Sequence, residues 1–298
     1  MNHALERLRA AGWLDERTEE ESIIWTRKLL GYDEIERLAP LGLEFYGQKV
    51  AMGQIAPFVS RAAPFPNTLI LGEPGIGKTR LARWIADQRT EPFEELMAPA
   101  KPEDFPTYGI VLLDEVHRQA RPEWLFPIME SATVTILGAT TRPEQLEPAF
   151  ASRFFLRLHL ARYEETAMIE MASSLLDDAT PETLATYAGA SAGNPRQLER
   201  IVAVAKEVGV NETEQVLAAC RINGDGLTDI HLKLLGTLRK GNRPMGLGTL
   251  AVMLYLDEET VRQHERLLIE YDLVELRPNG RFITRAGKRY MVALEQDR

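Results

Sequence analysis

The chain has 298 residues, of which 45% are hydrophobic and 27% charged, values typical of a soluble globular protein with two or three domains. No apolar run approaches the roughly 18–20 residues that a membrane-spanning helix needs, and the N-terminus lacks the apolar core of a secretory signal. A single cysteine, Cys220, excludes an internal disulfide and suits a reducing cytoplasm. We therefore expect a cytoplasmic protein that does not bind membranes.

The net charge of −9 argues against a generally basic surface of the kind that coats nucleic acids. The C-terminal quarter differs, because residues 225–298 carry 12 Lys and Arg against 11 Asp and Glu. The net charge therefore does not exclude a local basic patch in that quarter.

Residues 1–40 have helical patterns of apolar residues and an acidic run at 19–21, which predict a helical N-terminal extension. Such a run is most simply an exposed helix start, where acidic side chains favour the helix dipole. A docking arm for a partner is the alternative. We expect the next domain to begin near residue 41.

The first predicted strand, at residues 68–71, leads directly into the segment GEPGIGKT. This segment matches the phosphate-binding pattern G-x-x-x-x-G-K-[ST], and a helical pattern follows it. Glycines let backbone N–H groups curl around a phosphate, and the helix N-terminus adds a favourable dipole. We expect Lys78 to reach the β- and γ-phosphates of ATP and Thr79 to hold Mg²⁺. The residues expected to contact the nucleotide here are Glu73, Pro74, Gly75, Ile76, Gly77, Lys78, Thr79 and Arg80.

A second apolar run, at residues 109–113, ends in the two carboxylates Asp114 and Glu115, after a polar connection at residues 91–108. Ligands of open α/β sheets gather at the carboxyl edge of buried parallel strands. We expect Asp114 to hold Mg²⁺ and Glu115 to orient and deprotonate the attacking water. His117 has no Cys or His near it in the sequence, and we interpret it as structural or as a group behind the reacting residues.

A third run, at residues 133–139, ends at two threonines and an arginine. The hydroxyl of Thr141 could sense the γ-phosphate or position water at that strand end. Arg153 then precedes another apolar run, and alone it would be an ordinary surface residue. Strands alternating with helices over residues 68–158 predict an α/β fold with a doubly wound parallel sheet.

Helical periodicity replaces the strand pattern over residues 163–222, which predicts a small all-helical domain. Within it, Gly-Asn-Pro-Arg at residues 193–196 is expected to form a turn that opens a new helix. Gly224 and Gly226 mark a linker to a further domain.

The final domain is predicted to contain three helices and two short strands, at residues 229–240, 247–255, 258–271, 273–276 and 281–284. Pro-Asn-Gly between the strands is a hairpin signal, and three helices with a hairpin describe a winged helix. Its wing could lie along a DNA backbone; a winged helix that binds only protein is the alternative. The five basic residues expected to contact DNA are Arg277, Arg281, Arg285, Lys288 and Arg289.

Taken in order, these segments resemble the AAA+ ATPases, and among them the RuvB family of Holliday-junction branch-migration motors. The resemblance covers roughly residues 41–298. Its segments are similar to the family's entry segment (residues 43–48), Walker A (72–79), Walker B (113–118), sensor 1 (138–142), arginine finger (152–154), sensor 2 (193–196) and winged helix (244–251 and 277–281).

The resemblance implies a homo-oligomeric ring, with a hexamer expected, acting on duplex or branched DNA. Arg153 would then enter the site of a neighbouring subunit and stabilise charge on the γ-phosphate. Pro195 and Arg196 would contact the nucleotide, and Arg196 would report its state to the sheet. The domains that it implies are an AAA+ domain, a helical lid and a DNA-binding winged helix, at residues 41–160, 161–223 and 224–298. They follow the helical N-terminal extension expected at residues 1–40.

The chain departs from the family pattern at one place that bears on its partners. The family carries a β-hairpin before sensor 1, which docks its junction-binding partner RuvA, whereas here only residues 130–132 precede the sensor strand. We therefore expect a RuvB-like ATPase, helicase-like in its action on DNA, with a protein recruiter other than RuvA. The alternatives are a DNA-associated AAA+ loader or regulatory switch, and a protein-remodelling ATPase that uses the winged helix as an adaptor.

Overall fold

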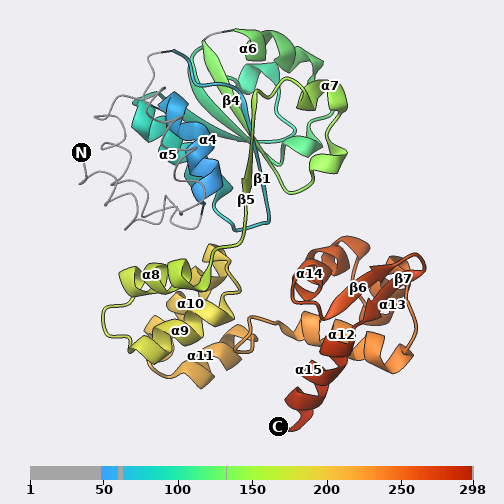
Figure 1. The fold of residues 1–298 in the computed structure, drawn as a ribbon. Helices are drawn as coiled ribbons and strands as arrows, with labels where there is room; N and C mark the ends of the chain where they lie inside the picture. The colour runs from blue at the N-terminus through green and yellow to red at the C-terminus, as the bar shows by residue number, and fades with distance from the viewer. Residues whose placement is uncertain (1–47, 60–62, 132, 297–298) are drawn as a thin grey trace, which may run out of the picture. The chain divides into compact units, whose positions relative to one another are not determined.

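The computed structural model describes residues 48–59, 63–131 and 133–296. They form two compact units (Figure 1). One comprises the residues through Met171 together with Gly193–Glu199, and the other comprises Ala172–Ala192 and the residues from Arg200 onward. The expected N-terminal extension, residues 1–40, lies outside the described residues. None of the helices that the structure describes is both long and apolar enough to span a membrane.

A five-stranded parallel sheet forms the centre of the first unit, with the strand order β2-β3-β4-β1-β5 (Figure 1). Its inner strands β3 and β4 are almost entirely buried, as expected of parallel strands covered on both faces. The strands are β1 (Thr68–Gly72), β2 (Phe93–Met97), β3 (Gly109–Asp114), β4 (Val134–Thr140) and β5 (Leu156–Leu160).

Strand β2 is a correction to the sequence prediction, which assigned residues 91–108 to a polar connection. It is one of the two edge strands and pairs only with β3, and most of its side chains are exposed. Glu94 and Glu95 occupy its centre. An edge strand of this composition contains no apolar run from which it could be recognised.

Helices cover both faces of the sheet, with α4 and α5 on one side and α6 and α7 on the other (Figure 1). Leu69, Val111 and Ile136 of the strands pack with Phe150 and Phe154 in one buried cluster. The helical elements are α4 (Lys49–Val59), α5 (Lys78–Arg89), η2 (Pro102–Asp104), η3 (Val116–Arg118), η4 (Pro122–Leu125), α6 (Phe126–Glu130), η5 (Pro143–Gln145) and α7 (Pro148–Ala151).

Helices α8 (Glu165–Leu175), α9 (Pro181–Ala190), α10 (Pro195–Val208) and α11 (Thr213–Cys220) match the all-helical pattern expected after residue 163. The buried Tyr187 of α9 donates its hydroxyl to the carbonyl of Val210 at 2.7 Å. Cys220 is buried and unoxidised, in the role of a small apolar side chain.

Helices α12 (Asp229–Gly241), α13 (Leu247–Leu254) and α14 (Glu258–Glu270) pack on the antiparallel pair β6 (Val274–Arg277) and β7 (Gly280–Ile283), the elements of a winged helix. Gly280 closes the wing with a φ of 126°, and a Cβ there would lie 2.1 Å from the carbonyl oxygen of Met245. Only glycine therefore fits this turn.

A further helix, α15 (Arg285–Gln296), follows the wing and was not foreseen from the sequence. It packs against α12. Three of the five predicted DNA-contacting cations, Arg285, Lys288 and Arg289, consequently lie on a helix and not on the wing itself. The sequence reasoning assigned all five charges to the wing, but the structure divides them between the wing strands β6 and β7 and the helix α15.

Candidate nucleotide-binding site

The loop between β1 and α5 is shaped by glycines in the left-handed region of backbone conformation. Gly75 has a φ of 80° and Gly77 a φ of 103°, values that L-residues with side chains rarely adopt. A Cβ on Gly75 would lie 2.7 Å from the Cβ of Arg196, so glycine also permits a close approach there. Gly77 is the N-cap of α5, the end at which a helix dipole favours an anion.

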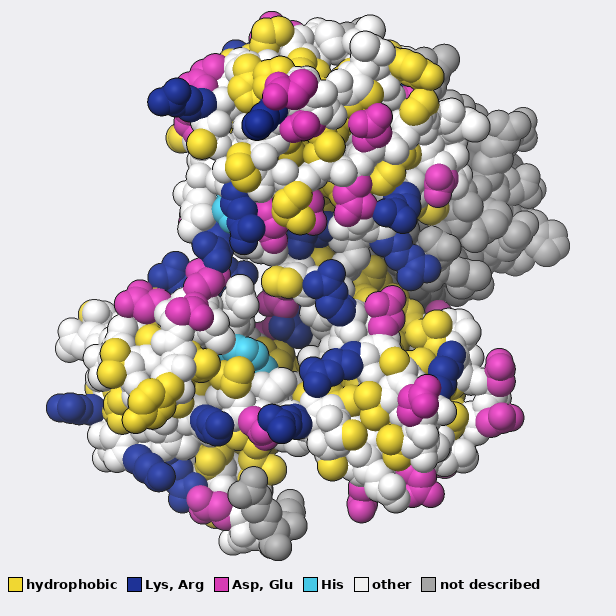
Figure 2. All heavy atoms as spheres, turned by 180° about the vertical axis from the view of Figure 1, so that it is seen from behind, with side chains coloured by type: hydrophobic (Ala, Val, Ile, Leu, Met, Phe, Trp, Pro, Cys, Tyr) yellow, Lys and Arg dark blue, Asp and Glu magenta, His cyan; other side chains and the backbone are white. Residues whose placement is uncertain are grey.

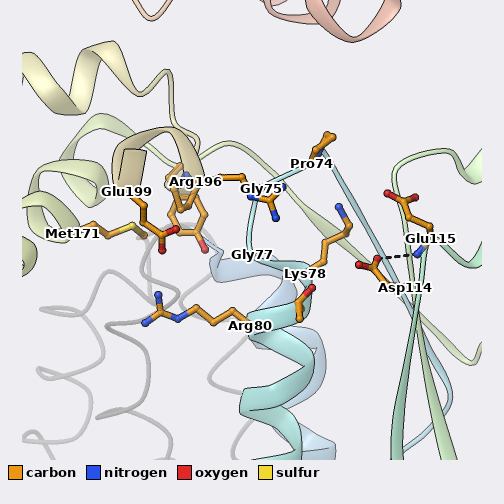
Figure 3. Close-up of a pocket in the computed structure, with 13 residues that line it drawn as sticks. Pro74, Gly75, Gly77, Lys78, Arg80, Asp114, Glu115, Met171, Arg196 and Glu199 are labelled. Atoms are coloured by element: carbon orange, nitrogen blue, oxygen red, sulfur yellow. Dashed lines mark hydrogen bonds between the residues drawn. The ribbon is translucent and has the colours of Figure 1, made fainter. Parts of the chain in front are cut away.

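A cavity of about 260 Å³ lies beside this loop (Figure 3). Its walls come from the loop, the start of α5, the carboxyl end of β3, the segment after β5, the middle of α8 and the start of α10. Most of the predicted nucleotide and metal residues meet here: Pro74, Gly75, Gly77, Lys78, Thr79, Arg80, Asp114, Glu115, Pro195 and Arg196.

Lys78 occupies the inner part of the cavity, and its residue surface is only 7% exposed. Its Nζ donates to the carbonyl oxygens of Gly72 at 3.0 Å and Glu73 at 2.9 Å. Burial lowers the pKa of Lys78, whereas the nearby carboxylates of Asp114 and Glu115 act to raise it. A buried ammonium of this kind gains most from an anionic ligand such as a phosphate.

Asp114 and Glu115 end β3 on the side of Lys78 (Figure 3). The backbone N–H of Glu115 donates to Oδ1 of Asp114 at 2.8 Å. Glu115 has a φ of 48°, a left-handed conformation that is costly for a residue with a Cβ. Its Oε2 lies 3.3 Å from the hydroxyl of Thr141 and 3.2 Å from Nδ1 of His117. Thr141 thus contacts a carboxylate of the cavity wall.

The segment that opens α10 is attached to the phosphate-binding loop. Asn194 donates its side-chain amide to the carbonyl of Pro74 at 2.9 Å, and the backbone N–H of Arg196 lies 3.4 Å from the carbonyl oxygen of Gly75. Gly193 has a φ of 69°, and a Cβ there would lie 2.5 Å from the carbonyl oxygen of Tyr163. This turn therefore holds the Arg196 side chain beside the loop.

Not every predicted residue lines the cavity. Ile76 is fully buried in the core, and the side chain of Glu73 forms an ion pair with Arg162 at 2.5 Å. Thr141 lies behind Glu115. Arg153 pairs with Glu130, and its guanidinium carbon lies 3.9 Å from the centroid of the Phe126 ring.

Arg153 consequently lies outside the cavity of its own chain. Its side chain is 34% exposed. The contacts with Phe126 and Glu130 define its position in one subunit, and its action on a neighbouring subunit stays a prediction.

Three cavity residues, Tyr163, Met171 and Glu199, were missed by the sequence reasoning. Burial raises the pKa of Tyr163 to about 12, so its hydroxyl remains protonated and able to donate. Tyr163 follows the carboxyl end of β5, and Glu199 lies one helical turn after Arg196. Tyr163 and Glu199 could have been found from these two positions, because the sheet edge and the start of α10 were both predicted to face the nucleotide.

The predicted DNA-contacting cations differ in their surroundings. Arg281 of β7 donates to both carboxylate oxygens of Glu265, at 2.5 and 2.8 Å. Arg277 pairs with Glu275 at 2.7 Å, and Lys288 donates to the side chain of Asn242 at 2.9 Å. The remaining two, Arg285 and Arg289, are exposed. Figure 2 shows Lys and Arg side chains interspersed with Asp and Glu side chains on the face that it draws.

A glycine loop at a helix N-terminus, a lysine reaching into the cavity, paired carboxylates at the end of the adjacent parallel strand and an arginine from a following helical segment define an AAA+ ATPase. The C-terminal region adds a winged helix, and the comparisons with known proteins narrow the class. Residues 224–292 match the RuvB C-terminal winged helix domain. The chain belongs to the RuvB family, because it is also 30% identical to a curated member of that family over 82% of its length.

The curated relatives match over most of their length. The Holliday junction branch migration complex subunit RuvB of Streptomyces coelicolor is 30% identical over an alignment 295 positions long. The alignment covers 82% of this chain and 83% of that protein. The corresponding protein of Streptococcus thermophilus is 27% identical over 83% of this chain and 90% of its own length. Among solved structures, the Thermotoga maritima RuvB Holliday junction branch migration motor has the same fold, with a TM-score of 0.70, 24% identity, and coverage of 88% of this chain and 95% of that one.

Proposed function

We propose that this chain is the subunit of an ATP-hydrolysing motor that acts on duplex or branched DNA as a homo-oligomeric ring, with six subunits expected. The observation that carries the proposal is the convergence of Lys78, Glu115 and Arg196 on one cavity at the carboxyl edge of the sheet. The names of the curated relatives point to the Holliday junction as the DNA substrate.

The cavity residues have separate roles in this reaction. Lys78 and Arg196 neutralise negative charge on the phosphates, since both are cationic and line the same cavity. Glu115 accepts a proton from the attacking water, and Thr141 orients that water through its contact with the Glu115 carboxylate. Positioning and charge neutralisation supply most of the catalysis in phosphoryl transfer.

Mg²⁺ fits the donor set. Magnesium in nucleotide sites is held by one or two protein oxygens together with phosphates and waters, and no all-protein cage is needed. Thr79 offers a hydroxyl and Asp114 a carboxylate on the same cavity wall, while the described residues contain no cluster of three or more His, Cys, Asp or Glu that would compete. When bound, the ion would neutralise charge on the phosphate oxygens.

The ring is supported by the position of Arg153, which is outside its own cavity and partly exposed. Arg153→Ala should lower turnover by about 10³-fold or more while nucleotide affinity is preserved, because an arginine supplied to a neighbour acts on the transition state. Mixing Arg153→Ala with Lys78→Ala subunits should restore some activity, since each variant supplies what the other lacks. Failure of any mixture to recover activity would contradict action between subunits.

Action on DNA is tested by two measurements on the full chain. ATP hydrolysis should be stimulated by duplex DNA and by a synthetic four-way junction. Branch migration should convert the junction into its duplex products only with hydrolysable ATP. Mass measurement with ATP, with and without DNA, gives the number of subunits. Hydrolysis that occurs once per assembly without moving the junction would favour the loader or switch.

Recruitment by a protein other than RuvA is supported by one feature of the sequence and fold. Helix α6 ends at Glu130 and β4 begins at Val134, so three residues stand where the family carries its docking hairpin. Purified RuvA should therefore fail to bind this chain or to stimulate its activity on junctions. Binding of RuvA at micromolar concentration would remove this part of the proposal.

A further inference from the structure

His117 lies directly behind the carboxylate that the proposed hydrolysis uses. It belongs to η3, which begins one residue after Glu115, and its side chain is 4% exposed. It does not line the cavity. Its Nδ1 lies 2.8 Å from Oγ1 of Thr140 and 3.2 Å from Oε2 of Glu115, so one ring nitrogen contacts both the sensor strand and the carboxylate.

The surrounding hydrogen bonds determine which nitrogen carries the proton. A carboxylate accepts only, and the hydroxyl oxygen of Thr140 already accepts from the backbone N–H of Arg142 at 2.9 Å. A bare Nδ1 lone pair would repel the Glu115 oxygen. The favourable assignment is therefore a proton on Nδ1, shared between Thr140 and Glu115.

The charge of the ring follows from its burial. Desolvation lowers the pKa of His117, which favours the neutral ring at neutral pH. Glu115 opposes this effect, as does Glu144 more weakly, whereas Arg142 and Arg118 act in the same direction as burial. Neutral His117 still donates from Nδ1, so its contact with the carboxylate does not depend on protonation.

Two donors thus converge on one oxygen of Glu115. Nδ1 of His117 approaches Oε2 from η3, and the hydroxyl of Thr141 approaches it from the end of β4. The backbone of Glu115 is held at the other side, where its N–H donates to Asp114. A carboxylate with a left-handed backbone and two donors on the same oxygen has a fixed direction, which is the condition for an effective general base.

We propose that His117 is a positioning residue for Glu115, in which the Nδ1–H donor, together with Thr141, directs the carboxylate toward the attacking water. The inference rests on the proposed ATP hydrolysis and assigns a role that neither motif spacing nor cavity lining gives to His117. The donor acts through Glu115 and does not touch the nucleotide.

The test compares His117→Asn with His117→Gln, which carry the same amide group on side chains of different length. The side-chain amide nitrogen of asparagine can occupy the place of Nδ1, whereas that of glutamine extends toward the place of Nε2. His117→Asn should retain at least half of the wild-type kcat. His117→Gln should lower kcat by about 10- to 100-fold, because misplacing a catalytic group by about 1 Å costs that much. KM and the affinity for a fluorescent ADP analogue should be unchanged in both variants.

A second readout separates positioning from a structural role. In the Glu115→Gln background, adding His117→Gln should leave the residual single-turnover rate unchanged, because the group through which His117 acts is already removed. His159 of β5 is exposed, so His159→Asn and His159→Gln are the matched controls and should behave as wild type.

Several results would overturn the inference. They are equal kcat values for the Asn and Gln variants, a rise in kcat on losing the donor, a parallel loss of nucleotide affinity, and a further fall in the Glu115→Gln background. A wild-type chain that binds ATP but does not hydrolyse it, with or without DNA, would defeat the proposed function as well. That outcome is visible before any variant is made.

Discussion

The nucleotide cavity and the winged helix use their charged residues in different ways. In the cavity, Lys78, Asp114 and Glu115 line an open volume, and their positions are set by backbone turns and strand ends. In the winged helix, Arg281 is satisfied by a buried carboxylate of its own domain, that of Glu265. A charged side chain near a predicted interface is therefore less available for a ligand when an oppositely charged, buried side chain of the same domain already pairs with it.

The difference also explains why one region is more predictable than the other. Residues of the phosphate-binding loop are fixed relative to each other by a few consecutive dihedral angles, so spacing along the chain specifies their geometry. The partner of Arg281 is 16 residues away on another element. Counting charges between residues 277 and 289 gives no information about such a partner.

The largest expected effect tests the cavity. Glu115→Gln should lower ATP hydrolysis by about 10²- to 10⁴-fold, the range that a general base contributes, because an amide cannot accept the proton of the attacking water. Nucleotide affinity should persist, since Lys78 and the glycine loop are untouched. Glu123→Gln, at an exposed position on η4, is the control. Normal turnover in the Glu115 variant would show that another group is the base.

The second prediction tests the winged helix. Arg281→Ala should destabilise this domain by about 2–3 kcal/mol, because it leaves the Glu265 carboxylate, whose side chain is 5% exposed, without its partner. The value is below that of a fully buried pair because the Arg281 side chain is 19% exposed. Hydrogen exchange in α14 measures the effect.

A matched comparison separates stability from DNA contact. The double variant Glu265→Met, Arg281→Met removes both charges and should be milder than Arg281→Ala, since no buried charge is then unpaired. If Arg281→Ala leaves exchange in α14 unchanged but abolishes DNA binding, the ion pair is dispensable and Arg281 belongs with the phosphate-contacting cations.

The sequence predicted the fold well where local patterns are strong. The buried strands were recognised from their apolar runs, and the hairpin from Pro-Asn-Gly. β2 was missed because an edge strand with two central glutamates has no such run, and α15 was missed because its basic residues were attributed to the wing. Apolar periodicity reports burial, so elements that are largely exposed give a weaker signal.

The site was predictable in part for a similar reason. Lys78, Asp114 and Glu115 occupy motif positions, and the structure brings them to one cavity. The contact of His117 with Glu115 depends on how η3 turns after a left-handed residue, which no spacing rule specifies. Met171 of α8 and Glu199 of α10 were missed because they approach the loop only through tertiary structure.

The third prediction concerns a cation that the fold leaves exposed. Arg289→Ala should reduce the slope of log affinity for duplex DNA against log salt concentration by about one, with only a modest loss of affinity, if Arg289 contacts a phosphate. Lys101→Ala, at an exposed position in the α/β unit, should leave the slope unchanged. An unchanged slope for Arg289→Ala would exclude Arg289 from the DNA-contacting surface.

The smallest expected effect is a pH dependence within the winged helix. His264 of α14 lies with its Nδ1 3.2 Å from Nε2 of the buried His231 of α12, and burial lowers the pKa of His264. The unfolded chain then binds more protons than the folded domain as pH falls below the ordinary histidine value of about 6.5. Stability should therefore fall with acidification through that value and level off below the folded pKa.

Hydrogen exchange in α12 and α14 between pH 7.5 and 5, corrected for the intrinsic exchange rate, measures this slope in the full chain. His264→Asn should make the slope shallower, whatever its effect at neutral pH, because the titrating group is gone. His117, whose pKa burial also lowers, lies in the other unit and should not contribute to exchange in these helices. The exposed His159→Asn serves as control, and an identical slope in wild type and His264→Asn would show that the histidine contact between α12 and α14 does not couple to folding.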